Sequence, residues 1–162
     1  MRRKVVVALA IGLLFYALSD ILLWQRIFEA HDLFLFDAQY QSGHVTVLVA
    51  LIATGMVLLY DARLWALWYG LAFYTLAFSG LEDILYYWLA GKPIVHALPW
   101  LNDNSLILFK PVTSEGLLVN AALWLGFWAV SLWLIPKVER LIAQLAGLSR
   151  ELLANHEARS SL

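Results

Sequence analysis

Long apolar runs separated by short polar stretches dominate this chain. A helix that crosses the ~30 Å hydrocarbon core of a bilayer needs about 20 apolar residues, and four runs approach that length: 5–24, 44–60, 64–89 and 116–135. The second and third runs are separated only by residues 61–63, which predicts a tight hairpin of antiparallel helices. We therefore predict an all-α integral membrane protein whose residues 1–136 form a four-helix transmembrane bundle.

The pattern changes after Pro136, which we expect to stop the fourth run. In the tail, residues 137–162, apolar side chains recur at steps of three and four: Val138, Leu141, Ile142, Leu145, Leu148, Leu152 and Leu153. This spacing predicts an amphipathic helix. It could lie in the membrane interface or form a short oligomerisation coil, and we favour the interface because two heptads are few for a coiled coil.

Lysine and arginine at the span ends predict the orientation. With the N-terminus in the cytoplasm, eight of these residues lie on the cytoplasmic side and only Arg26, Lys92 and Lys110 lie outside, as the positive-inside rule requires. Both termini are then cytoplasmic, in a plasma-type membrane. The first run also resembles a signal peptide cut before Asp20, but the apolar run resumes at Ile21, which favours an uncleaved span.

Composition narrows the class of protein further. Of the 162 residues, 62% are hydrophobic and 14% are charged, against roughly 45–50% and 25% in soluble domains. A soluble enzyme and a nucleic-acid binder are therefore excluded. The chain has no cysteine, which excludes disulfides and thiolate chemistry. The two long outer loops, 25–43 and 90–115, are rich in aromatics, so we expect them to fold over the outer mouth of the bundle or lie on the membrane surface.

Polar residues inside the predicted spans are the informative feature. Five of them recur at helical spacing on the third span and should share one face: Thr75, Ser79, Glu82, Asp83 and Tyr86. The other spans offer polar groups at a similar depth, in the outer third of the membrane: Tyr16, Ser19 and Asp20 on the first, His44 on the second and Asn120 on the fourth. A carboxylate facing hydrocarbon costs at least ~2.5–3.5 kcal/mol, so these groups should face the bundle interior.

Three interpretations of this polar layer stay open. Four span residues, Asp20, His44, Glu82 and Asp83, could bind Zn, Mn or Fe together with His31 or His96, and the metal could activate water for hydrolysis. Without a metal, Glu82 and Asp83 repel each other, can share a proton and could act as general acid and base, with Asp20 and His44 beside them. A purely structural alternative pairs Asp83 or Asp20 with Arg26, Lys92 or Lys110.

Further residues are candidates for contacting a ligand: Ser79, Tyr86, Asn120, Tyr16 and Trp100. Each also has a structural interpretation. Asn120 is typical of interhelical hydrogen bonding, Trp100 of a loop anchor, and His44 of a helix cap.

The segment Leu81-Glu82-Asp83-Ile84-Leu85-Tyr86-Tyr87 resembles the acidic-pair signature of small membrane lycopene cyclases, which is Pro-x-Glu-Glu/Asp before aromatic residues. Gly80, or Ser79 in an alignment shifted by one position, stands where that signature has proline. The resemblance is confined to this segment and implies acid–base chemistry on an isoprenoid. Ceramidase-like zinc hydrolases use similar residue types, but this chain lacks their histidine pair, and it is assigned to neither family.

These observations predict a small membrane protein that binds or acts on a lipid or isoprenoid-like ligand in an outer-leaflet carboxylate site. Membrane lipid is an expected partner, and the chain could form a homo-oligomer or belong to a larger membrane complex. The alternative is a non-catalytic subunit whose polar layer contacts a partner protein or a cofactor such as haem, carotenoid or quinone.

Overall fold

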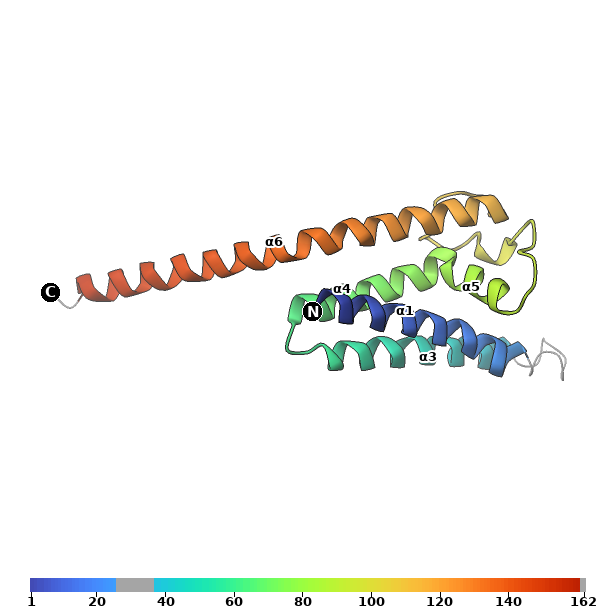
Figure 1. Cartoon of the computed structure of the whole chain (residues 1–162), viewed down its shortest axis with the longest axis horizontal. Coiled ribbons are helices and arrows are strands. Elements are labelled where there is room, and N and C mark those ends of the chain that lie inside the picture. Colours follow the sequence, from blue (N-terminus) through green and yellow to red (C-terminus); the bar gives the residue numbers. More distant parts are fainter. Residues whose placement is uncertain (26–36, 161–162) are drawn as a thin grey trace. The chain divides into compact units, whose positions relative to one another are not determined.

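The computed structural model describes residues 1–25 and 37–160, and the ordered elements in these ranges are helical (Figure 1). One isolated β-bridge joins Ala97 to Thr113. Four helical segments are long and apolar enough to cross a membrane: Arg2–Leu23, Tyr40–Leu58, Arg63–Leu89 and Ser114–Arg150. The prediction of an all-helical chain with four such segments is therefore confirmed.

The helices follow the predicted runs closely. The elements in chain order are α1 (Arg2–Ser19), the π-helical turn η1 (Asp20–Gln25), α3 (Asp37–Leu58), α4 (Arg63–Leu76), the π-helical turn η3 (Ala77–Leu81), α5 (Glu82–Leu89), the 3₁₀ turn η4 (Pro99–Leu101) and α6 (Ser114–Ser160). They divide into two compact units, Met1–Trp128 and Ala129–Leu162.

Helices α1, α3, α4 and α5 pack side by side in the first unit (Figure 1). Their core is aromatic and aliphatic, with Tyr16, Phe73 and Leu76 almost wholly buried. Gly55 lets α3 approach α4 closely, because a Cβ there would overlap the ring of Tyr69. Small residues at helix crossings are a usual way to bring membrane helices together.

A kink at Gly80 divides the third apolar run into α4 and α5. Gly80 has φ +87°, a left-handed conformation that residues with a Cβ rarely adopt. It is also close-packed, because a Cβ would overlap the Leu117 side chain of α6. The predicted polar stripe assumed one straight helix, and the kink breaks it: Thr75 and Ser79 lie before the bend, and Glu82 lies after it.

Two further boundaries differ from the sequence prediction. Helix α3 begins at Asp37, so Tyr40 and Gln41 are helical rather than part of an outer loop; residues 26–36 of that loop lie outside the described residues. Helix α6 does not stop at Pro136, which lies inside it. Proline removes one backbone donor, and apolar helices tolerate this loss when neighbouring groups or small local adjustments satisfy the freed carbonyl.

The connection between α5 and α6 belongs to the first unit and packs against the start of α6. Leu98, Ile107 and Val112 bury their side chains against Leu117 of α6. The two ends of the connection pair through their backbones, with Leu98 N donating to Val112 O at 3.0 Å and Ser114 N donating to His96 O at 3.1 Å. This packing fixes the 3₁₀ turn η4, which contributes to the site described below.

The second unit, Ala129–Leu162, contains the remainder of α6. Its described apolar side chains are largely exposed: Trp133, Leu134, Val138, Leu141, Ile142, Leu145 and Leu148. Lys137 Nζ lies 3.3 Å from the centre of the Trp133 ring, a cation–π contact. The role of this segment as an interfacial tail stays a prediction.

Candidate functional site

The first unit contains a cavity of about 570 Å³ where the C-terminal end of α1 meets the N-terminal part of α3, the kink and α5. Polar and aromatic side chains dominate its wall. Its lining residues are Tyr16, Asp20, Tyr40, Gln41, His44, Val45, Ala77, Phe78, Glu82, Asp83, Tyr86, Tyr87, Trp100, Leu101 and Asn104.

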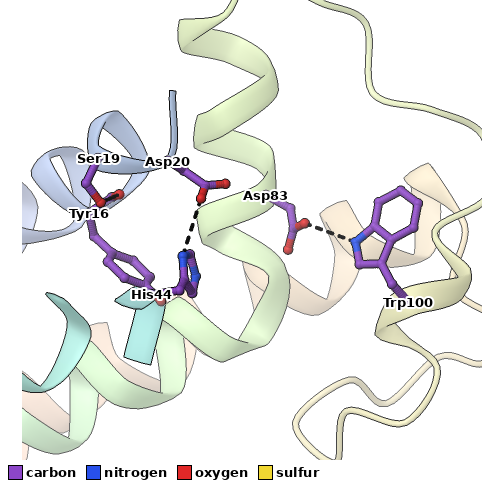
Figure 2. Close-up of polar contacts among 6 residues, drawn as sticks. All are labelled: Tyr16, Ser19, Asp20, His44, Asp83 and Trp100. Carbon is purple, nitrogen blue, oxygen red and sulfur yellow. Dashed lines mark hydrogen bonds and ion pairs between the residues drawn. The ribbon is translucent and has the colours of Figure 1, made fainter. Parts of the chain in front are cut away.

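Asp20 and His44 form one side of the cavity, where η1 faces α3. The His44 Nδ1 and Asp20 Oδ1 atoms lie 3.3 Å apart (Figure 2). The Tyr40 hydroxyl makes a side-chain hydrogen bond with Asp20. The His44 ring is flanked by the rings of Tyr16, at 4.6 Å between centroids, and Tyr40, at 5.3 Å. Two tyrosines therefore hold the imidazole beside the carboxylate of a neighbouring helix.

Asp83 and Trp100 form the opposite side. Trp100 Nε1 donates to Asp83 Oδ1 at 3.5 Å, a long hydrogen bond that links the first turn of α5 to η4 (Figure 2). Since 3.5 Å exceeds the usual 2.7–3.2 Å range of N–H···O bonds, this contact stabilises the Asp83 carboxylate only weakly.

Glu82 is the most enclosed carboxyl group of the site. Only 8% of its surface is exposed, and its Oε1 atom has no hydrogen-bond partner among the described residues. Among the described residues, no lysine or arginine forms an ion pair with Glu82, Asp83 or Asp20. The alternative in which a basic residue pairs with Asp83 or Asp20 therefore finds no partner in Lys92 or Lys110. Its third candidate, Arg26, lies outside the described residues.

Two asparagine amides hold the kink that places Glu82. A widened helical turn leaves backbone carbonyls without their usual partners. Asn104 Nδ2 donates to Phe78 O at 2.6 Å, and Asn120 Nδ2 donates to Ser79 O at 2.8 Å. Asn120 Oδ1 also accepts from Leu108 N at 3.0 Å. The kink is thus tied both to the α5–α6 connection and to α6.

Most of the predicted site residues meet at this cavity. Seven of them line it: Asp20, His44, Glu82, Asp83, Tyr16, Tyr86 and Trp100. Ser79 and Asn120 lie behind the wall and shape the kink; the Ser79 hydroxyl donates to Leu76 O at 2.9 Å. His96 lies in the α5–α6 connection and does not line the cavity, and His31 lies outside the described residues.

Sequence reasoning missed several wall residues, among them Tyr40, Gln41 and Asn104. The signal for the first two was available: continuing the helical period of the second span one turn toward the N-terminus from His44 reaches Tyr40 and Gln41. Asn104 lies in the predicted outer loop 90–115, and nothing in the neighbouring sequence indicated that its amide would reach the Phe78 carbonyl.

Among the side chains that the structure describes, in residues 1–23 and 40–150, no three histidines, aspartates or glutamates gather closely enough to hold a metal ion. The arrangement instead offers proton-transfer groups and aromatic walls. Comparison of the chain with protein-family models, with curated proteins and with solved structures gives no match.

Proposed function

We propose that the four long helices span a membrane, with the cavity near the extracytoplasmic side. Helix α1 supports insertion, because Val7, Ile11 and Phe15 recur every four residues on one face and are each more than half exposed. Large apolar side chains exposed along a whole helix face indicate a lipid or protein environment. The bias of lysine and arginine toward the opposite side supports the orientation.

We further propose that the cavity binds a lipid or isoprenoid-like ligand, with its polar end against Glu82. The observation that carries this proposal is the buried Glu82 oxygen that lacks a hydrogen-bond partner in the described structure. A buried polar group without a partner costs about 1–3 kcal/mol, and more when it is charged, so a ligand that supplies the partner would bind favourably. The volume of about 570 Å³ falls within the ~300–1,000 Å³ of small-molecule sites.

Acid–base chemistry fits the site better than metal-assisted chemistry. A carboxyl group with a free oxygen can donate a proton when neutral and accept one when ionised. Glu82 and Asp83 are neighbours at the start of α5, and the Asp20–His44 pair lines the same cavity. We assign proton transfer on the ligand to Glu82 and Asp83, with Asp20 and His44 as a second acid–base pair.

The ligand can be sought directly by extracting the purified protein. Wild type and three variants, Glu82→Gln, Asp83→Asn and Asp61→Asn, are purified in a mild neutral detergent, and bound small molecules are measured by mass spectrometry. Asp61 is the matched control, since it is an exposed carboxylate in the turn between α3 and α4. We expect one compound class to be retained by wild type and Asp61→Asn and to be depleted in Glu82→Gln.

Equal retention by wild type and Glu82→Gln would exclude Glu82 as a ligand contact. A protein subunit that co-purifies in a fixed ratio, with no enriched small molecule, would favour the non-catalytic alternative. For the acid–base role, the retained compound is incubated with protein in deuterated water. Wild type should catalyse exchange of a ligand hydrogen, and Glu82→Gln should not.

A further inference from the structure

The charge of the cavity wall is one-sided. Asp20, Glu82 and Asp83 contribute three carboxyl groups, and the only basic group in the described lining is His44. The His44 Nδ1 atom lies 3.3 Å from Asp20 Oδ1, and no lysine or arginine of the described chain forms an ion pair with Glu82 or Asp83. Carboxylates in a poorly hydrated site strongly favour a compensating positive charge.

The wall is also rich in aromatic rings. Six line the cavity together with the carboxylates: Tyr16, Tyr40, Phe78, Tyr86, Tyr87 and Trp100. The faces of such rings attract cations, and quaternary ammonium groups are bound in proteins by cages of this type. Carboxylates alone would suit any cation, whereas carboxylates among aromatic rings suit an organic one.

An inorganic ion fits this wall less well. A divalent metal needs several oxygen or nitrogen ligands at about 2.0–2.6 Å, and the described histidine and acidic residues provide no group of three that could hold one. A cavity of about 570 Å³ is also much larger than a bare ion requires, and it leaves room for an organic head group and the start of an apolar chain.

We propose that the ligand of this cavity is an amphiphilic organic cation, an amine or quaternary ammonium group attached to an apolar chain, with its nitrogen between Glu82 and Asp83 and the aromatic rings. This inference rests on the proposed ligand-binding function and specifies the chemical class of the ligand. The Glu82 carboxylate supplies the main charge contact, and Trp100 and the tyrosines surround the head group.

Three probes that share a hexyl chain separate head-group charge from apolar contact: hexyltrimethylammonium, hexanol and hexanoate. Each is titrated by calorimetry into the full chain in neutral maltoside micelles. Hexyltrimethylammonium has no N–H to donate, so its advantage over hexanol comes from its charge, through attraction to the Glu82 and Asp83 carboxylates and through about 2 kcal/mol of desolvated cation–π contact. We therefore expect hexyltrimethylammonium to bind at one site about 10- to 100-fold more tightly than hexanol, with no saturable binding of hexanoate.

The variants test where the cation binds. Glu82→Gln removes a charge that attracts the cation and should weaken the binding of hexyltrimethylammonium about 10- to 100-fold. Asp83→Asn should weaken it less because Trp100 partly engages that carboxylate, and Asp61→Asn should leave it unchanged. Since Glu82→Gln removes a buried unpaired carboxyl group, we expect this variant to fold. Circular dichroism and gel filtration check that it does.

Several outcomes would overturn the inference. Hexanol that binds as tightly as the cation and loses affinity in Glu82→Gln would establish a neutral ligand, and would leave the proposed function standing. If wild type retains a lipid but none of the three probes binds saturably, the inference of a cationic ligand fails, and the proposed ligand-binding function stands. Stoichiometric, Glu82-dependent binding of Zn²⁺ or Mn²⁺ that displaces the cation would assign the site to a metal.

Discussion

Replacing Gly80 by alanine tests whether the kink that places the acidic pair is built as described. The change should destabilise the fold for two separate reasons. Alanine at φ +87° takes up the left-handed conformation, which costs roughly 1–2 kcal/mol. Its Cβ would also overlap the fully buried Leu117 side chain, and overpacking of this kind costs about 1–3 kcal/mol. The expected loss in the free energy of unfolding is therefore about 2–5 kcal/mol.

Alanine substitutions at two other glycines separate the backbone cost of the left-handed φ from the cost of overlap with Leu117. Gly91 also has a left-handed φ, +64°, but a Cβ there would meet no atom within 4 Å, so Gly91→Ala should lose only the backbone part, about 1–2 kcal/mol. Gly126 is helical and equally open, so Gly126→Ala should be neutral or gain about 0.5–1 kcal/mol. From most to least stable, the expected order is Gly126→Ala, wild type, Gly91→Ala and Gly80→Ala.

The assay is reversible unfolding in mixed micelles, measured by the loss of helical circular dichroism. Leu117→Ala is added as a second background, because it removes the atoms that the new Cβ would overlap. In that background, Gly80→Ala should cost only the roughly 1–2 kcal/mol of its backbone term. If Gly80→Ala is as stable as wild type, the left-handed kink does not exist. If Gly80→Ala loses no more unfolding free energy than Gly91→Ala does, Leu117 does not pack against the kink as described.

Three further predictions concern the bundle. Asn120→Ala removes hydrogen bonds to three backbone groups and should lower the unfolding free energy by about 2–4 kcal/mol; a loss below ~1 kcal/mol would contradict this bonding. A double-mutant cycle of Trp128→Phe and Thr75→Val, whose side chains hydrogen-bond at 2.6 Å, should give a coupling of about 0.6–1.7 kcal/mol, and zero coupling would refute the contact. Since the chain has no cysteine, Asp61→Cys and Lys92→Cys introduce single thiols. In sealed cells a membrane-impermeant maleimide should label only the thiol at position 92, and labelling at position 61 would reverse the proposed orientation.

The positions of the long helices were readable from the sequence because one constraint dominates them. A hydrocarbon core demands about 20 apolar residues per helix, and the apolar runs alone located α1, α4 with α5, and the N-terminal part of α6. The acidic pair was readable for the same reason. Glu82 and Asp83 stand out in an apolar run, and the energetic cost that carboxylates have in lipid predicted that they face a shared interior site.

The kink could not be predicted from the sequence, although the sequence shows a glycine at position 80. A glycine within an apolar run is compatible with a straight helix, and its left-handed φ depends on Leu117, which lies 37 positions further along the chain. The polar stripe was therefore predicted to be continuous, which put Ser79 on the same face as Glu82. The structure separates the two and gives the freed carbonyls to Asn104 and Asn120.

The start of α3 was missed because its first turns are polar. Residues 37–43 contain few apolar side chains, so a search for hydrocarbon-spanning runs began the helix near His44. The structure begins it at Asp37, and this brings Tyr40 beside Asp20. Polar helical turns of this kind resemble loops when hydropathy is the only guide.

An experimental structure of the full chain in lipid nanodiscs, at a resolution that shows side chains and bound ligands, tests the central claim most directly. We expect Glu82 and Asp83 to face one cavity together with Asp20 and His44, and non-protein density to lie within hydrogen-bonding distance of the Glu82 carboxylate. A Glu82 side chain that is paired with a lysine or arginine of this chain, in a cavity closed by protein side chains, would contradict the account.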